Sequence, residues 1–373
     1  MAVNELLAAF HEIASSPKKQ LDHYLAMGKE VIACAPIYIP EEIIHSMGLV
    51  PMGVWGADTE IKEAKRYFPA FICGIMQSIL ELGIQGKYQG ISALVVPSLC
   101  DSLKCLGQNW KYGVADIPFI PVTCPQNRKE DYGKNFTKAG YERMIADLEV
   151  ATKAKFSEAA LTKSIVVYNE HNRVMRELDQ VLADHPSITA SQRSDIYKSA
   201  WFLLKEEHTE MVRNLLAEIQ SMPPEENHKI KVITSGILAD NQNLLDLFET
   251  NGLQIVADDV AEESRQYRVD TPESGNPMDA LAQKFADMDH CSVLYDPDKK
   301  RPDYIVDLVK KTHAAGVVIL MTKFCDPEEF DYVLIKKACE AADIPTIQIE
   351  VDRQMGSYEQ AGTMIQTFKE ILA

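Results

Sequence analysis

The sequence predicts an α/β protein of two lobes, each a mainly parallel sheet flanked by helices, with a helical segment joining them. Three observations support this fold. Short runs that are apolar on both faces alternate with helical patterns over 31–122 and again over 230–351, which is typical of parallel sheets. Residues 136–225 carry only helical spacing. The length of 373 residues suits about two domains.

The first lobe is predicted over residues 1–135. It begins with an amphipathic helix over 5–27, and glycine ends two of its later helices, at Gly48 and Gly83. The expected strands are 31–40, 49–56, 91–97 and 117–122, and the helices between them are 41–48, 71–83 and 102–113. Strands and helices therefore alternate through the whole lobe.

The connecting segment, 136–225, is expected to be helical and to end in a proline-rich, charged linker at 222–229. The second lobe, 226–373, repeats the alternation of strands and helices. Its expected strands are 230–236, 253–259, 291–296, 316–322 and 344–351, and its helices are 243–252, 303–316, 326–343 and a terminal helix. Two Rossmann- or flavodoxin-like lobes are therefore expected.

The composition narrows the class of protein. The hydrophobic fraction of 46% allows real cores, and the net charge of −17 argues against nucleic acid or an anionic membrane as the main partner. No apolar run is long enough for a transmembrane helix, and the N-terminus does not read as a signal peptide. We therefore expect a cytoplasmic protein, in which eight cysteines are poor candidates for structural disulfides.

A repeated pattern links the two lobes. ALVVPSLCDSLK is followed by ADIPFIPV, and GVVILMTKFCDPEE is followed by ADIPTIQIEV. Each copy reads strand, Cys-Asp, helix, Asp-Ile-Pro, strand, with the cysteine at Cys100 in one copy and Cys325 in the other. Open α/β sheets bind ligands at the carboxyl ends of their strands. The two cysteines could therefore face each other across a cleft between the lobes.

A third cysteine, Cys73, opens a helix after RYFPAF, and a helix N-terminus favours a thiolate or an anionic cluster. Cys73, Cys100 and Cys325 together would suit an iron–sulfur cluster. The alternative is that they are ordinary buried thiols, which is the commoner role of cysteine. The roles of Cys34 and Cys124 stay open. Three further cysteines are expected to be small buried apolar residues: Cys105, Cys291 and Cys339.

Other features have mainly structural interpretations. The acidic segment 256–268 contains Arg265 and Arg268, and it is expected to be a solvated loop of ion pairs. His45 is expected to be satisfied by partners on its helix rather than to bind a ligand. There is no G-x-G-x-x-G, P-loop, H-E-x-x-H or C-x-x-C motif. Dinucleotide and ATP binding therefore have no motif support.

Several blocks, in the same order, resemble the β subunits of 2-hydroxyacyl-CoA dehydratases. The resemblance covers nearly the whole length, so it is far more specific than any one motif. The blocks are YIPEEIIHSMGLVPMGVWG, RYFPAFICGIMQS, PSLCDSLKCLGQNWK, CPQNR, VYNEHNRVMREL, KEEHT, ADDVAEESRQYRVD and MTKFCDPEEFDY. The family often has histidine where Cys124 precedes PQNR, so no role is assigned to Cys124.

The resemblance implies a heterodimer with a homologous α subunit, in which each subunit carries a 4Fe-4S cluster on three cysteines. Motif by motif these are Cys73 in FICGIMQ, Cys100 in LCDSLK and Cys325 in KFCDPEE. The fourth cluster ligand is not indicated. The resemblance also leaves open whether a flavin, FMN or riboflavin, is bound in the complex.

The implied reaction is elimination of water from an (R)-2-hydroxyacyl-CoA to give the (E)-2-enoyl-CoA. A transient activator that hydrolyses ATP supplies one electron, the resulting ketyl radical expels hydroxide, and the electron then returns. The substrate is expected mainly at the α subunit, so this chain would relay or store the electron. No acid–base residue is assigned here.

Two alternatives remain at this stage. The chain could be a subunit of the benzoyl-CoA reductase type, which shares the fold and ligand plan but reduces a ring. It could also be a cluster-free, two-lobed protein that binds a small ligand or scaffolds a partner. The sequence does not identify the acyl group of the substrate.

Overall fold

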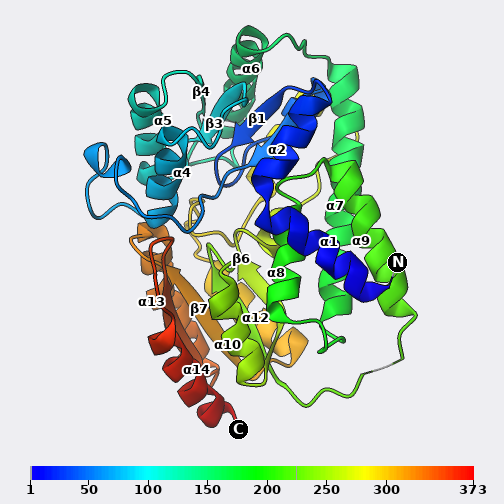
Figure 1. Ribbon diagram of the computed structural model, residues 1–373, viewed down its shortest axis with the longest axis vertical. Helices are drawn as coiled ribbons and strands as arrows, with labels where there is room; N and C mark the ends of the chain where they lie inside the picture. The colour runs from blue at the N-terminus through cyan, green and yellow to red at the C-terminus, as the bar shows by residue number, and fades with distance from the viewer. Residues whose placement is uncertain (1, 224) are drawn as a thin grey trace.

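The computed structural model describes residues 2–223 and 225–373, and Figure 1 shows two α/β lobes with helices α7 to α9 running alongside both. Met1 and Pro224 lie outside the described residues, and Pro224 belongs to the predicted linker at 222–229. No helix in the described part of the chain is both long and apolar enough to cross a bilayer.

The first sheet contains four parallel strands in the order β2-β1-β3-β4. The strands are short and fully buried except for the edge strand β4, because helices cover both faces of the sheet. Their bounds are β1 Val31–Cys34, β2 Val50–Gly53, β3 Ala93–Pro97 and β4 Phe119–Val122.

The second sheet repeats this order as β6-β5-β7-β8, again with every pair parallel. Its strands are β5 Ile230–Gly236, β6 Leu253–Val260, β7 Gly316–Thr322 and β8 Thr346–Val351. In both sheets the chain reverses its direction of winding beside the first strand of the sheet. The carboxyl ends of the strands at such a reversal are where open α/β sheets hold ligands. The predicted class, with two Rossmann-like lobes, is confirmed.

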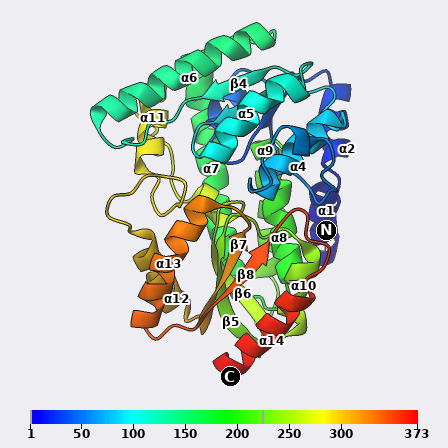
Figure 2. The ribbon, with the colours of Figure 1, turned by 90° about the vertical axis from the view of Figure 1, so that its left-hand side faces the viewer.

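Helices cover both faces of each sheet, and each sheet has a separate apolar core on either face. In the first lobe these helices are α2 Pro17–Ala26, α3 Glu41–Ser46, α4 Gly74–Ile84, α5 Asp101–Gly113 and α6 Asp131–Ala151. In the second lobe they are α10 Gln242–Thr250, α11 Pro277–Asp287, α12 Arg301–Thr312, α13 Asp326–Ala341 and α14 Glu359–Leu372. Figure 2 shows that α11 lies beside α6 of the first lobe, where Met278 and Leu281 join its core.

A fifth core belongs to the helical segment. It packs α1 (Val3–Ser15) against α7 (Glu158–Leu182), α8 (Ala190–Ser199) and α9 (Lys205–Gln220). Polar groups are buried with it: His171 Nε2 lies 2.9 Å from His208 Nδ1, and His208 Nε2 lies 3.0 Å from the carbonyl of Ile196. Both imidazoles are fully enclosed, so they must be neutral or pay a large desolvation cost.

Two predicted elements were wrong in detail. The helix expected over 5–27 is broken at Ser16, whose extended φ of −132° precedes Pro17 at the first position of α2. The strand expected at 291–296 is a turn, closed by Leu294 N donating to Cys291 O. The carbonyl of Tyr295 accepts instead from the Arg128 guanidinium at 2.5 Å. An apolar run thus found a side-chain partner rather than a strand.

Candidate functional site

The three cysteines predicted as ligands each stand immediately before a helix. Cys73 is the N-cap residue of α4, Cys100 of α5 and Cys325 of α13. Cys100 follows β3 and Cys325 follows β7, so both lie at carboxyl ends of central strands. Three helix N-termini with their free backbone N–H groups therefore begin at the three sulfur-bearing residues.

The fold brings these cysteines within electrostatic reach of one another, although they come from both lobes. The Cys73 thiol affects the pKa of Cys100, and both affect the pKa of Cys325. The Ser102 side chain, in the first turn of α5, acts directly on Cys73. The cysteines thus share one region between the two sheets.

Burial dominates the chemistry of these thiols. It raises the pKa of Cys73, raises that of Cys100 to about 12, and raises that of Cys325 well above its ordinary value. Backbone amides of the helices act in the opposite direction, those of Met76 and Leu103 for example. The isolated thiols are therefore neutral, and a bound metal would have to displace their protons.

Among residues 2–223 and 225–373, no three Cys, His, Asp or Glu side chains are close enough to share one metal ion. A 4Fe-4S cluster makes a different demand, because its four irons take one ligand each. Three soft sulfur ligands, set at three helix starts and shielded from water, fit the chemistry of such an anionic cluster.

A groove with a volume of about 630 Å³ opens beside these cysteines, between the two lobes. Its walls include Ala70 and Gln77 on the Cys73 side, and Lys323 and Phe324 on the Cys325 side. Phe324 has a φ of +59°, a conformation that a bulky residue rarely adopts and that often marks a functional site.

The two lobes touch closely at the edge of this groove. A Cβ atom placed on Gly74 would lie only 2.0 Å from Asp352 Oδ1, so only glycine fits there. The next residue, Arg353, donates to the carbonyl of Trp55 at 3.2 Å and to Asp240 at 2.7 Å. Glycine at position 74 thus allows the second lobe to approach the start of α4.

The acidic segment 256–268 is not the solvated loop expected from the sequence. Asp259 is fully buried and accepts from Arg265 at 3.1 Å, from Arg268 at 2.8 Å and from Arg301 at 2.8 Å. Arg301 also grips Glu328 through two nitrogens, at 2.9 and 3.0 Å. Cations remote in sequence make this burial affordable, and a single sequence does not reveal them.

Glu328 connects this buried network to the candidate site, because it lies in the first turn of α13, three residues after Cys325. Burial alone would raise the pKa of Glu328, but Arg301 and Arg265 lower it below its ordinary value. The carboxylate also accepts from Ser292 at 2.6 Å. The network therefore fixes the start of the helix that follows Cys325.

The remaining cysteines divide in three ways. Cys291 and Cys339 are buried, as predicted, but Cys105 is exposed, because it lies on the outer face of α5. Cys124 is partly buried and contributes to the raised pKa of Tyr141. Cys34 is buried at the end of β1, beside Glu41 rather than beside the three candidate ligands.

His45 is held as predicted. Its Nδ1 lies 2.8 Å from Ser164 Oγ, and its Nε2 lies 2.9 Å from the Glu206 carboxylate. Both ring nitrogens thus have partners on other helices, α7 and α9. The partners come from a distance rather than from its own helix.

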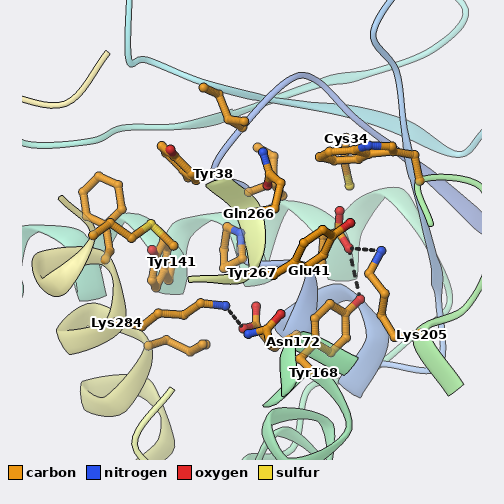
Figure 3. Close-up of a pocket in the computed structure, with 18 of the residues that line it drawn as sticks. Cys34, Tyr38, Glu41, Tyr141, Tyr168, Asn172, Lys205, Gln266, Tyr267 and Lys284 are labelled. Atoms are coloured by element: carbon orange, nitrogen blue, oxygen red, sulfur yellow. Dashed lines mark hydrogen bonds and ion pairs between the residues drawn. The ribbon is translucent and has the colours of Figure 1, made fainter. Parts of the chain in front are cut away.

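A second pocket was missed by the sequence reasoning, and Figure 3 shows it. It has a volume of about 70 Å³ and is lined by residues from 34–42, α6, α7, α9, the 264–267 turn and α11. Four blocks quoted for the resemblance meet there: YIPEE, VYNEHN, KEEHT and SRQY. Their recurrence without an assigned role was the available signal.

The comparisons agree with one another. The family model for the 2-hydroxyglutaryl-CoA dehydratase D-component matches residues 36–372. The (R)-phenyllactyl-CoA dehydratase β subunit of Clostridium sporogenes is 48% identical over 97% of each chain. The lactoyl-CoA dehydratase β subunit of Anaerotignum propionicum is 41% identical over 99% of each chain. The (R)-2-hydroxyglutaryl-CoA dehydratase β subunit of Acidaminococcus fermentans is 37% identical over 100% of each chain.

Model and relatives extend across both lobes and the helical segment, so the likeness is not that of one domain. All three relatives are β subunits, which implies that such chains work with a partner subunit. The chain belongs to the 2-hydroxyacyl-CoA dehydratase β-subunit family and is a subunit of a hydro-lyase.

Proposed function

We propose that this chain is the β subunit of an (R)-2-hydroxyacyl-CoA dehydratase and holds a 4Fe-4S cluster on Cys73, Cys100 and Cys325. The observation that carries the proposal is that these cysteines, from two lobes, each begin a helix and act on one another electrostatically. Thiolates hold such clusters, and helix N-termini favour their negative charge.

When bound, the cluster would supply low-potential one-electron chemistry, which an elimination at a non-acidic β-hydrogen requires. A separate activator that hydrolyses ATP delivers the electron to the enzyme. The residues of this chain provide three thiolates, a buried setting, and the Arg301–Glu328 contact that holds the start of α13. Since the matching model and the relatives are dehydratases, elimination is favoured over ring reduction.

The homologous α subunit is the proposed permanent partner and the main site of the 2-hydroxyacyl-CoA. Aromatic side chains near the groove support a contact there: Phe71 is 73% exposed and Phe330 is 77% exposed. Exposed aromatics of this kind are enriched at protein interfaces. The binding of a flavin and the choice of relay or storage stay predictions from the resemblance.

Iron and sulfide analysis of the anaerobically purified protein tests the cluster. We expect about four irons per chain, and we expect serine at Cys73, Cys100 or Cys325 to lower that number and bleach the brown colour. Two matched controls should keep it: Cys105→Ser, which is exposed, and Cys339→Ser, which is buried in α13.

A colourless wild-type protein, or full iron content in all three serine variants, would contradict the cluster proposal and favour a binding or scaffold protein. The reaction itself is tested with the reconstituted subunit pair, the activator and ATP. Water loss from a panel of (R)-2-hydroxyacyl-CoA thioesters is the expected result, and reduction of an aromatic acyl-CoA instead would refute it.

A further inference from the structure

The pocket in Figure 3 lies apart from the three cysteines, where the first lobe, the helical segment and α11 meet. Its walls carry two acidic and two basic side chains, and these neutralise each other in pairs. Lys205 lies 3.2 Å from Glu41, and Lys284 lies 2.6 Å from Glu42. A charged ligand would lose its hydration without meeting a free counter-charge, so the pocket favours a neutral one.

Two tyrosine hydroxyls in the wall lack a partner. Tyr141 is 4% exposed and Tyr267 is 5% exposed, and neither hydroxyl makes a hydrogen bond to any described residue. Tyr168, in the same wall, does bond, to Glu41 at 3.2 Å. A buried phenol needs a partner. The two free O–H groups would therefore donate to an oxygen of the ligand.

The rest of the wall is apolar and includes Ile37, Leu281, Phe285 and Met288. Ile37 has a φ of +37°, which a β-branched residue adopts only under strain, and such strain gathers at ligand sites. The volume of about 70 Å³ admits only a small group. We propose that this pocket binds a short, uncharged carbonyl compound, its oxygen between Tyr141 and Tyr267 and its apolar end toward α11.

This chemistry has two sources, a free short-chain carbonyl compound or the acyl end of a thioester. The site is built from paired charges and phenols, and it does not use Cys73, Cys100 or Cys325. The inference therefore stands or falls independently of the cluster.

The probe is isobutyramide, compared with isobutyrate, which has the same shape but carries a charge. Saturation-transfer NMR measures binding to the protein in the assembly in which it is isolated. We expect saturable binding of isobutyramide and at least 10-fold weaker binding of isobutyrate. The double change Tyr141→Phe and Tyr267→Phe removes two hydroxyls and should weaken isobutyramide about 10-fold. Tyr112→Phe, an exposed control, should change nothing.

A crystal soaked in isobutyramide should show it between the two tyrosines. Thermal melting of the Phe variants separates lost binding from lost folding. Absence of saturable binding, equal binding of isobutyrate, or unchanged affinity in a folded double variant would overturn the proposal. Competition by isobutyryl-CoA would identify the thioester as the source, and absence of competition would identify the free compound.

Discussion

The buried histidine pair of the helical segment makes the stability of the protein depend on pH. Ser199 Oγ donates to Ile196 O at 2.8 Å, so it accepts from His208 Nε2 at 3.1 Å. His208 Nδ1 must then accept from His171 Nε2. A second proton on His208 would place N–H against N–H, in a site with no water to screen the charge. Burial, and then the Lys205 charge, lower the pKa of His208 to about 3.

The magnitude follows from proton linkage. The unfolded chain binds a proton at His208 below about pH 6.5, whereas the folded chain does not until about pH 3. The contribution of this residue to the free energy of unfolding therefore falls as the pH is lowered through that window. From pH 8 to pH 5 the loss is about 2 kcal/mol. His171, whose pKa burial also lowers, acts in the same direction.

The assay is urea unfolding at pH 5, 6, 7 and 8, followed by circular dichroism, for the wild type and for His208→Gln. The variant does not titrate at this position, so its stability should fall by about 2 kcal/mol less over the range. Comparing slopes rather than absolute stabilities cancels the cost of the substitution and the effect of every other group. Identical pH slopes in the two proteins would refute the buried, neutral assignment of His208.

Three further changes have defined outcomes. Gly74→Ala places a Cβ 2.0 Å from Asp352 Oδ1 and should lower the free energy of unfolding by about 1–3 kcal/mol in urea, whereas Gly356→Ala, with no atom within 4 Å, should be neutral. Arg193→Met strands buried carboxylates such as Glu263 and should cost about 3–5 kcal/mol in the same assay; a loss below 1 kcal/mol would contradict the ion network. Lys18→Met removes only an exposed i,i+4 pair, so calorimetry should show a change within about 0.5 kcal/mol.

Much of this protein was determined by local patterns in the sequence. Runs such as 93–97 and 316–322 are apolar on both faces, and that property alone places them inside parallel sheets. The repeated Cys-Asp after these strands located Cys100 and Cys325 at strand ends, because a helix must begin there for the chain to return. Family membership also needed only the ordered blocks.

Tertiary structure alone decided which residues meet. Asp259 is buried rather than solvated because Arg301, far along the chain, arrives beside it. The run at 291–296 is a turn because Arg128 claims the Tyr295 carbonyl. The pocket joins residues from six segments, none of which marks it alone. Periodicity reports how a segment meets its own sheet or helix, whereas charge pairing and cavity shape depend on neighbours that only the folded chain supplies.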